Sequence, residues 1–274
     1  MRSIIKRVQI NIPLHLLHEK HLSTIIKERI NPEISFNYFV LDHFKRKDLK
    51  KIANAIIKAG LTITMHAPFM DLRPGAIDPK IRQVSIDRFK QFFELIPYFQ
   101  PGLVVCHASF DEKYYVGCMK RWIENSIDTW RQFLPLAREM NTIITLENVY
   151  ENSPHYLALM LDSLKSPYIH FCFDTGHFNA FSKASLKEWI DRLGPYLKQL
   201  HLHDNTGFAD EHLPVGDGNF PFYELFKILE EQSIDPVITL EPHTEEDLRK
   251  SLKNIKKMKL METKHTELNH SAGP

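Results

Sequence analysis

Short runs rich in β-branched and aromatic residues alternate with longer amphipathic stretches along most of this chain. The candidate strands are residues 4–12, 33–39, 61–67, 102–108, 141–148, 168–174, 197–204 and 236–242. Each of these from the second onward is followed by a segment with helical spacing of its apolar residues. Regular strand and helix alternation is typical of a parallel sheet, and the count of eight predicts an α/β fold with a single closed (β/α)8 TIM barrel. An open, doubly wound sheet is the alternative.

The length of 274 residues suits one barrel with one core. We expect the barrel to cover residues 1–257. Thr244 before Glu245 and Glu246 is a typical helix start, so the last helix is expected to begin there. From Met258 the sequence loses its periodicity, and residues 258–274 are predicted to form a poorly ordered tail.

Composition excludes several classes of protein. The formal net charge is +1, so bulk charge gives no attraction to nucleic acid, and no run approaches the 18 apolar residues of a membrane span. The three cysteines, Cys106, Cys118 and Cys172, are odd in number and far apart, which favours buried thiols over a disulfide framework. We therefore expect a cytoplasmic protein without a membrane partner.

Residues able to bind a metal collect where the predicted strands end. The stretch HLHDNTGFADEHLPVGDG, residues 201–218, is the densest example. The candidate metal ligands are His66, His107, Glu147, Asp174, His177, His201, Asp210, His212 and Glu241. In a barrel the carboxyl ends of all strands meet at one mouth, where active sites of this fold lie. The pattern predicts a metal site at that mouth.

Glu147 and Glu241 are carboxylates at the ends of two predicted strands. Each ends the same apolar run, ITLE, and a carboxylate there is costly to bury unless it is paired or bound to a cation. Mixed imidazole and carboxylate ligands favour Zn²⁺, with Mn²⁺ or Co²⁺ as alternatives, over Ca²⁺. The simpler interpretation of the 201–218 loop is a turn with surface histidines and carboxylate caps.

Taken together, the motifs MHAPF (65–69), VVCHAS (104–109), TLEN (145–148), FDTGH (173–177), HLHDN (201–205), DEHLPVGDG (210–218) and TLEP (239–242) resemble the xylose isomerase-like TIM barrel superfamily. That superfamily includes sugar isomerases and epimerases, inosose dehydratases and nucleases of the endonuclease IV type.

The resemblance implies two different metal centres. Sugar isomerases and epimerases hold one ion, here with Glu147, Asp174, His201 and Glu241. The nuclease type holds three zinc ions, here with His66, His107 and Glu147 on the first, the four residues just named on the second, and His177, Asp210 and His212 on the third.

These centres imply competing functions. The presence of all nine residue types favours hydrolysis of a phosphate ester or phosphodiester by a trinuclear zinc centre, with Glu147 and Glu241 positioning the attacking water. The alternative is a sugar or sugar-phosphate isomerase or epimerase with one divalent metal, in which the same two carboxylates move a proton. A binding protein that keeps the metal without turnover is a third alternative.

The expected partner is a small, phosphorylated substrate. A nucleotide-containing metabolite is favoured over duplex DNA because the loops at the mouth are not plainly basic, although an abasic-site endonuclease is a further alternative. Val149 stands two residues after Glu147, where classical xylose isomerases carry a catalytic lysine, so that subfamily is not expected.

Overall fold

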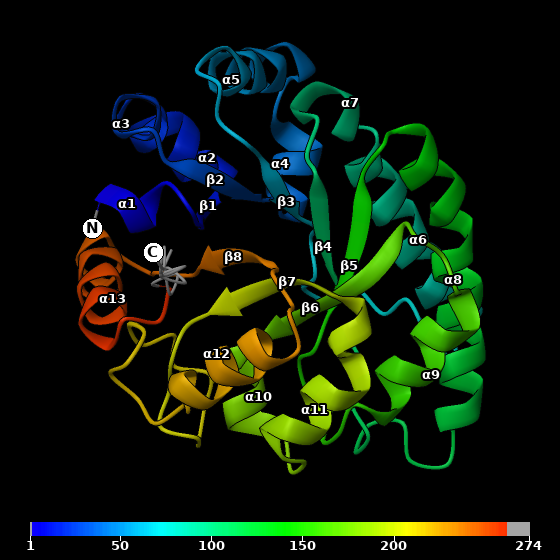
Figure 1. The fold of residues 1–274 in the computed structure, drawn as a ribbon. Helices are drawn as coiled ribbons and strands as arrows, with labels where there is room; N and C mark the ends of the chain where they lie inside the picture. The colour runs from blue at the N-terminus through cyan, green and yellow to red at the C-terminus, as the bar shows by residue number, and fades with distance from the viewer. Residues whose placement is uncertain (1, 262–274) are drawn as a thin grey trace, which may run out of the picture.

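The computed structural model describes residues 2–261 and contains a closed barrel of eight parallel strands in the order β1 to β8. The strands are β1 Gln9–Pro13, β2 Asn31–Ser35, β3 Thr64–His66, β4 Leu103–His107, β5 Ile143–Glu147, β6 Ile169–Asp174, β7 Leu197–Leu202 and β8 Val237–Leu240. Figure 1 shows the helices arranged around these strands. The predicted TIM barrel is confirmed.

The helices form the outer layer between successive strands. They are α1 Arg2–Ile5, α2 Leu14–Leu16, α3 Leu22–Glu28, α4 Tyr38–His43, α5 Arg46–Lys58, α6 Pro79–Phe93, α7 Ile96–Phe99, α8 Met119–Glu139, α9 His155–Leu164, α10 Thr175–Phe181, α11 Leu186–Leu193, α12 Phe222–Glu231 and α13 Glu245–Met258. A π-helical turn, Leu17–His21, joins α2 to α3, and a 3-10 turn, Gly194–Tyr196, precedes β7. No helix among residues 2–261 is long and apolar enough to cross a membrane.

The apolar core lies mainly between the strands and the helices. Helix α5 shows the pattern, because its buried residues Leu49, Ile52, Ala53 and Ile56 fall on one face at helical spacing. Helix α13 begins at Glu245, directly after the N-cap Thr244, whose hydroxyl accepts a hydrogen bond from the backbone N–H of Asp247 (3.1 Å). These helices cover the outer face of the barrel with apolar side chains.

The inside of the barrel is polar at its centre. Gln199 of β7 donates to the Thr239 hydroxyl of β8 (3.1 Å) and accepts from the Thr145 hydroxyl of β5 (3.2 Å). All three side chains are fully buried. Because side chains alternate across a strand, the inward Thr145 and Glu147 interleave with the buried apolar Ile144 and Leu146. Strand β5 thus carries apolar residues to the helices and polar residues to the barrel interior.

Two details differ from the sequence-based expectations. The first strand begins at Gln9 rather than at residue 4, because Ile4 and Ile5 belong to the short helix α1, which packs against the core. A short apolar run does not distinguish a strand from a buried helical turn. Cys118 is exposed just before α8, whereas Cys106 and Cys172 are buried as expected.

The chain end is only partly described. Helix α13 runs to Met258, and Leu260 is buried against the core. The Arg7 guanidinium donates to the backbone carbonyl of Met261 (2.6 Å). Residues 262–274 of the predicted tail lie outside the described residues.

Glu151, in the segment between β5 and α9, is a buried carboxyl group with few partners. One of its oxygens accepts from the Val149 backbone N–H (2.6 Å), and the other has no hydrogen-bond partner. Burial raises the pKa of Glu151 to about 7, against the lowering effect of the Val149 N–H. The folded protein therefore keeps a proton here that the unfolded chain releases at lower pH.

This difference gives a pH-dependent stability prediction. As pH rises from about 4.5 to about 7, the unfolded chain loses the proton first, so Glu151 progressively destabilises the folded state. We expect Glu151→Gln to raise the free energy of unfolding by about 2 kcal/mol at pH 8 and by much less at pH 5. Urea unfolding at both pH values measures this. An equal effect at the two pH values would show that the carboxyl does not titrate in this range.

Candidate metal centre

The ends of six consecutive strands bring all nine predicted ligands into one cluster at the mouth of the barrel. Strands β3, β4, β5 and β6 end at His66, His107, Glu147 and Asp174, respectively. His177 lies in α10, and His201 lies near the end of β7. Asp210 and His212 lie in the loop after β7, and Glu241 is the residue that follows β8. Contacts of 3.0 to 3.8 Å between imidazole nitrogens and carboxylate oxygens link the whole set.

Glu147 is the centre of this cluster. Its Oε2 lies 3.2 Å from His66 Nε2, 3.5 Å from His107 Nε2 and 3.4 Å from His201 Nδ1. Its Oε1 lies 3.1 Å from His177 Nδ1. Burial opposes ionisation, but the nearby His107 and His201 hold the pKa of Glu147 well below its usual range. A buried carboxylate surrounded in this way is a candidate ligand for a cation.

A second convergence surrounds His201, which is fully buried. Its Nδ1 lies 3.0 Å from Glu241 Oε1, 3.4 Å from Glu147 Oε2 and 3.8 Å from Asp174 Oδ2. Burial would raise the pKa of Glu241, but His201 lowers it to about 2. Burial opposes the protonation of His201, but the surrounding acidic groups hold its pKa well above its usual range. Three carboxylates and one imidazole therefore converge on one point, where a bound cation would replace the proton of His201.

The loop after β7 supplies a third convergence. Asp210 Oδ2 lies 3.3 Å from His177 Nε2 and 3.2 Å from His212 Nε2. Burial acts to lower the pKa of His212, but the Asp210 carboxylate and the nearby Glu241 raise it to about 9. The histidine and aspartate of the D-x-H segment thus turn back into the mouth, as the sequence predicted.

Backbone carbonyls fix the ring orientation of two histidines. His66 Nδ1 lies 2.8 Å from the carbonyl of Ala67, and His177 Nδ1 lies 3.0 Å from the carbonyl of Asn148. When Nδ1–H donates to a carbonyl, Nε2 carries the lone pair, and in both rings Nε2 faces a carboxylate of the cluster. Outer hydrogen bonds of this kind orient metal-binding histidines.

Unpartnered polar atoms test whether a metal fits. The buried atoms His201 Nδ1, His203 Nδ1, His212 Nδ1 and Asp210 Oδ1 make no hydrogen bond. Buried polar atoms without partners cost free energy, and a cation among them would satisfy several at once. The mixed nitrogen and oxygen donors suit Zn²⁺, Mn²⁺ or another first-row divalent ion. The residues present fit a metal centre.

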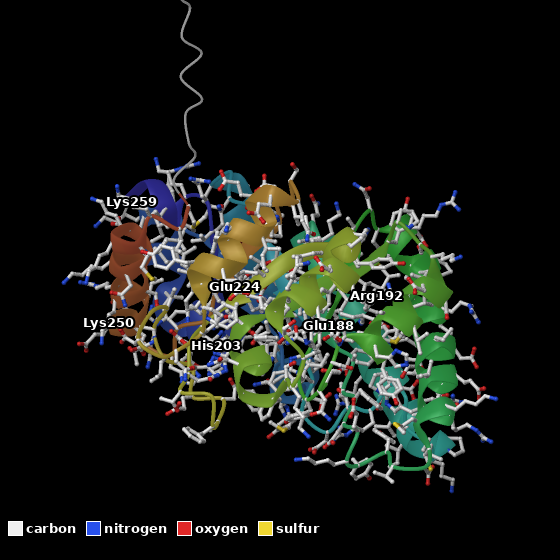
Figure 2. All side chains as sticks on the ribbon, turned by 60° about the horizontal axis from the view of Figure 1, so that its bottom comes forward. Glu188, Arg192, His203, Glu224, Lys250 and Lys259 are labelled. Atoms are coloured by element: carbon white, nitrogen blue, oxygen red, sulfur yellow. The ribbon has the colours of Figure 1, made fainter. Side chains whose placement is uncertain are left out.

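His203 belongs to the cluster, although the sequence analysis assigned it no role. Its Nε2 lies 3.0 Å from each oxygen of Asp174. Its ring stacks on His212 at 3.8 Å between centroids, and His212 stacks on His243 at 4.6 Å. Gly176 makes room for His203, since a Cβ there would lie 1.9 Å from the ring. Figure 2 shows His203 inward from α13, beside the yellow loop after β7.

Glu33 of β2 is the other residue that was missed. It is fully buried, and its Oε1 lies 3.1 Å from His201 Nε2. The predicted strand 33–39 placed Glu33 at its first residue, whereas β2 begins at Asn31 and holds Glu33 in its middle. The usable signal was the alternation of the polar Asn31, Glu33 and Ser35 with the apolar Pro32 and Ile34. Cys172, expected to be a simple core thiol, also has its sulfur near Glu147 and His201.

Comparison with known proteins is consistent with this architecture. The chain is 27% identical over 217 residues to the uncharacterized protein MJ1311 of Methanocaldococcus jannaschii, covering 77% of this chain and 74% of that protein. It is 24% identical over 205 residues to MJ1614 of the same organism, covering 72% of this chain and 78% of that protein, which is also uncharacterized.

Solved structures share the fold at low sequence identity. A D-tagatose 3-epimerase-like protein matches with a TM-score of 0.77 and 24% identity, over 91% of this chain and 96% of that chain. The TTHB071 protein from Thermus thermophilus, soaked with ZnCl₂, matches with a TM-score of 0.77 and 21% identity, over 92% of this chain and 97% of that chain.

The family assignment rests on a match that covers most of the barrel. The model of the xylose isomerase-like TIM barrel family matches residues 33–258, which include all nine predicted ligands. This chain therefore belongs to the xylose isomerase-like TIM barrel family.

Proposed function

We propose that this protein is a divalent-metal-dependent sugar isomerase or epimerase. The observation that carries the proposal is the convergence of Glu147 and Glu241 on His201 Nδ1, at 3.4 and 3.0 Å, with Asp174 beside them. Glu147 is the last residue of β5 and Glu241 follows β8, so the two carboxylates approach this point from different sides of the mouth. Paired carboxylates around one cation suit proton transfer at a carbon next to a carbonyl.

The four residues Glu147, Asp174, His201 and Glu241 would hold the cation. A bound divalent cation would polarise the carbonyl and adjacent hydroxyl of a ketose. The pKa values of Glu147 and Glu241 both lie below their usual range because histidines face them, so both groups are ionised at neutral pH. One ionised carboxylate can then accept the proton from carbon, and the same group, now protonated, can return it to the neighbouring carbon. For inversion at one carbon, the other carboxylate would deliver a proton that it has first taken from solvent.

Relatives of the same fold support this choice over hydrolysis. Besides the tagatose epimerase-like protein, the fold is shared with a D-psicose 3-epimerase crystallised with D-fructose and with an L-ribulose 3-epimerase. The sequence analysis favoured a phosphoesterase because all nine ligand types were present. We place proton transfer on a sugar first because it needs only the four residues around His201.

Hydrolysis of a phosphate ester is the second candidate, and the surplus ligands favour it. His66 and His107 form a compact group with Glu147, and Asp210 lies between His177 and His212. One cation at His201 does not require these five side chains. They would supply the further ligands of a multinuclear centre of the kind that clamps a phosphate.

Removal of either proposed proton carrier provides the first test. We expect wild-type protein loaded with Mn²⁺, Co²⁺ or Zn²⁺ to exchange a carbon-bound hydrogen of a ketose with deuterated solvent. A panel of free and phosphorylated ketopentoses and ketohexoses, followed by NMR, measures this exchange. Glu147→Gln and Glu241→Gln should each lower the rate by at least about 10²-fold, since general acid and base groups contribute that much.

Glu224→Gln is the matched control, because Glu224 is an exposed residue of α12 that is not part of the cluster. It should keep the wild-type rate. Exchange that survives in both cluster variants would remove the carboxylates from the reaction. Failure of wild-type protein on every ketose, together with turnover of a phosphodiester such as bis(p-nitrophenyl) phosphate, would replace the first candidate by the second.

A double variant, Asp210→Ala with His212→Ala, also distinguishes the sugar isomerase or epimerase from the phosphoesterase. The double variant removes Asp210, which faces His177, and His212, which faces Asp210, but none of the four residues around His201. We expect it to keep at least one bound metal per chain and to exchange ketose hydrogens within about tenfold of the wild-type rate, because the proposed single-ion set is intact. Elemental analysis and the same NMR assay measure both quantities. Complete loss of exchange with the remaining metal still bound would contradict a single-ion mechanism.

A further inference from the structure

Glu33 is a buried carboxylate below the metal cluster that the proposed reaction does not use. It is fully buried in the middle of β2, and it pairs across the sheet with Asn11 of β1 and Thr64 of β3. No lysine or arginine forms an ion pair with it among the described residues. Its partners are instead neutral hydrogen-bond donors and one histidine, and these few groups must stabilise its buried negative charge.

Hydrogen bonds from four other strands hold both oxygens of Glu33. Oε2 accepts from the hydroxyls of Thr64 (3.0 Å) and Thr239 (3.1 Å) and from the side-chain amide of Gln199. Oε1 accepts from the side-chain amide of Asn11 (2.9 Å). A carboxylate with this many donors is fixed in position, because moving it would break several buried hydrogen bonds.

The remaining contact of Oε1 is His201 Nε2, at 3.1 Å. The opposite nitrogen of that ring, Nδ1, is buried and makes no hydrogen bond, and it faces Glu241 and Glu147. If Nε2 carries the proton that Glu33 accepts, Nδ1 carries the lone pair. The ring is thereby held in the tautomer and orientation that a metal ligand needs.

Asn11 extends the same arrangement to Glu241. Its amide donates to Glu33 Oε1 (2.9 Å) and to Glu241 Oε1 (3.2 Å), and its carbonyl oxygen accepts from the Ser35 hydroxyl (2.6 Å). Glu33 therefore lies behind two of the four residues that would hold the cation, directly behind His201 and through Asn11 behind Glu241.

We propose that Glu33 is a positioning residue of the metal centre, which accepts a hydrogen bond from His201 Nε2–H and so directs His201 Nδ1 to the cation. This inference rests on the proposed metal site at His201. Outer-shell partners of this kind change metal affinity by about 10- to 100-fold when they are replaced. Glu33 itself would not touch the metal or the substrate.

Metal affinity of Glu33→Gln, compared with a matched variant, tests the proposal. Thr64→Val is the match, because it removes one hydrogen bond to the far oxygen of Glu33 and leaves the His201 contact in place. Competition between the full-length protein and a chromogenic chelator for Zn²⁺ gives each dissociation constant. We expect about 10- to 100-fold weaker binding for Glu33→Gln and a change below about threefold for Thr64→Val. Equal affinities in the two variants would assign Glu33 a purely structural role.

The tautomer of His201 provides a measurement that needs no Glu33 variant. Nitrogen-15 NMR of the zinc-loaded wild-type protein, with His201→Asn to assign the signal, should show a protonated Nε2 and a metal-bound Nδ1 at His201. A protonated Nδ1 would overturn the proposal even if Glu33→Gln failed to fold. Failure of the wild-type protein to bind any divalent metal would instead contradict the proposed function, so the two failures are distinguishable.

Discussion

The burial of ionised carboxylates at the mouth of the barrel is the constraint around which the rest of the site is arranged. Glu33, Glu147 and Asp174 are fully buried or nearly so, and none of them has a lysine or arginine partner among the described residues. Such groups are stable in a protein interior only when cations or strong hydrogen-bond donors face them. Around Glu147 and Asp174 the facing groups are mainly imidazoles, which can bind a metal as readily as they can carry a proton. Around Glu33 they are four neutral donors and the imidazole of His201.

The barrel makes this arrangement possible because each strand has two different faces. Residues directed to the helices, such as Ile144 and Leu146, supply the apolar core, while the alternate residues Thr145 and Glu147 face the interior. The polar layer around Gln199 and Glu33 then supports the ligands above it. Most barrels of this fold fill the interior with branched apolar side chains. The polar interior of this barrel instead provides hydrogen-bond partners for residues at the mouth.

Sequence alone predicted the fold and most of the cluster because both depend on periodic features. Eight strands recur at regular spacing, and residues at strand ends must meet at one mouth whatever the loops do. The structure brings the nine predicted residues together, although their roles as ligands are still proposals. His203 and Glu33 were missed because their importance depends on contacts across the barrel, with Asp174 and His201, that no local pattern reveals. The exposure of Cys118 was missed because burial of a single loop residue depends on packing.

Metal content per chain is the most direct test of the central claim that this cluster is a metal centre. It should be measured by elemental analysis on full-length protein purified without a metal-affinity tag or a chelator, before and after incubation with Zn²⁺ or Mn²⁺. At least one first-row divalent ion per chain is expected, and Glu147→Gln should lower that number. Wild-type protein that holds no metal and takes up neither ion would contradict the claim, because the unpartnered nitrogens of His201 and His212 would then need another explanation.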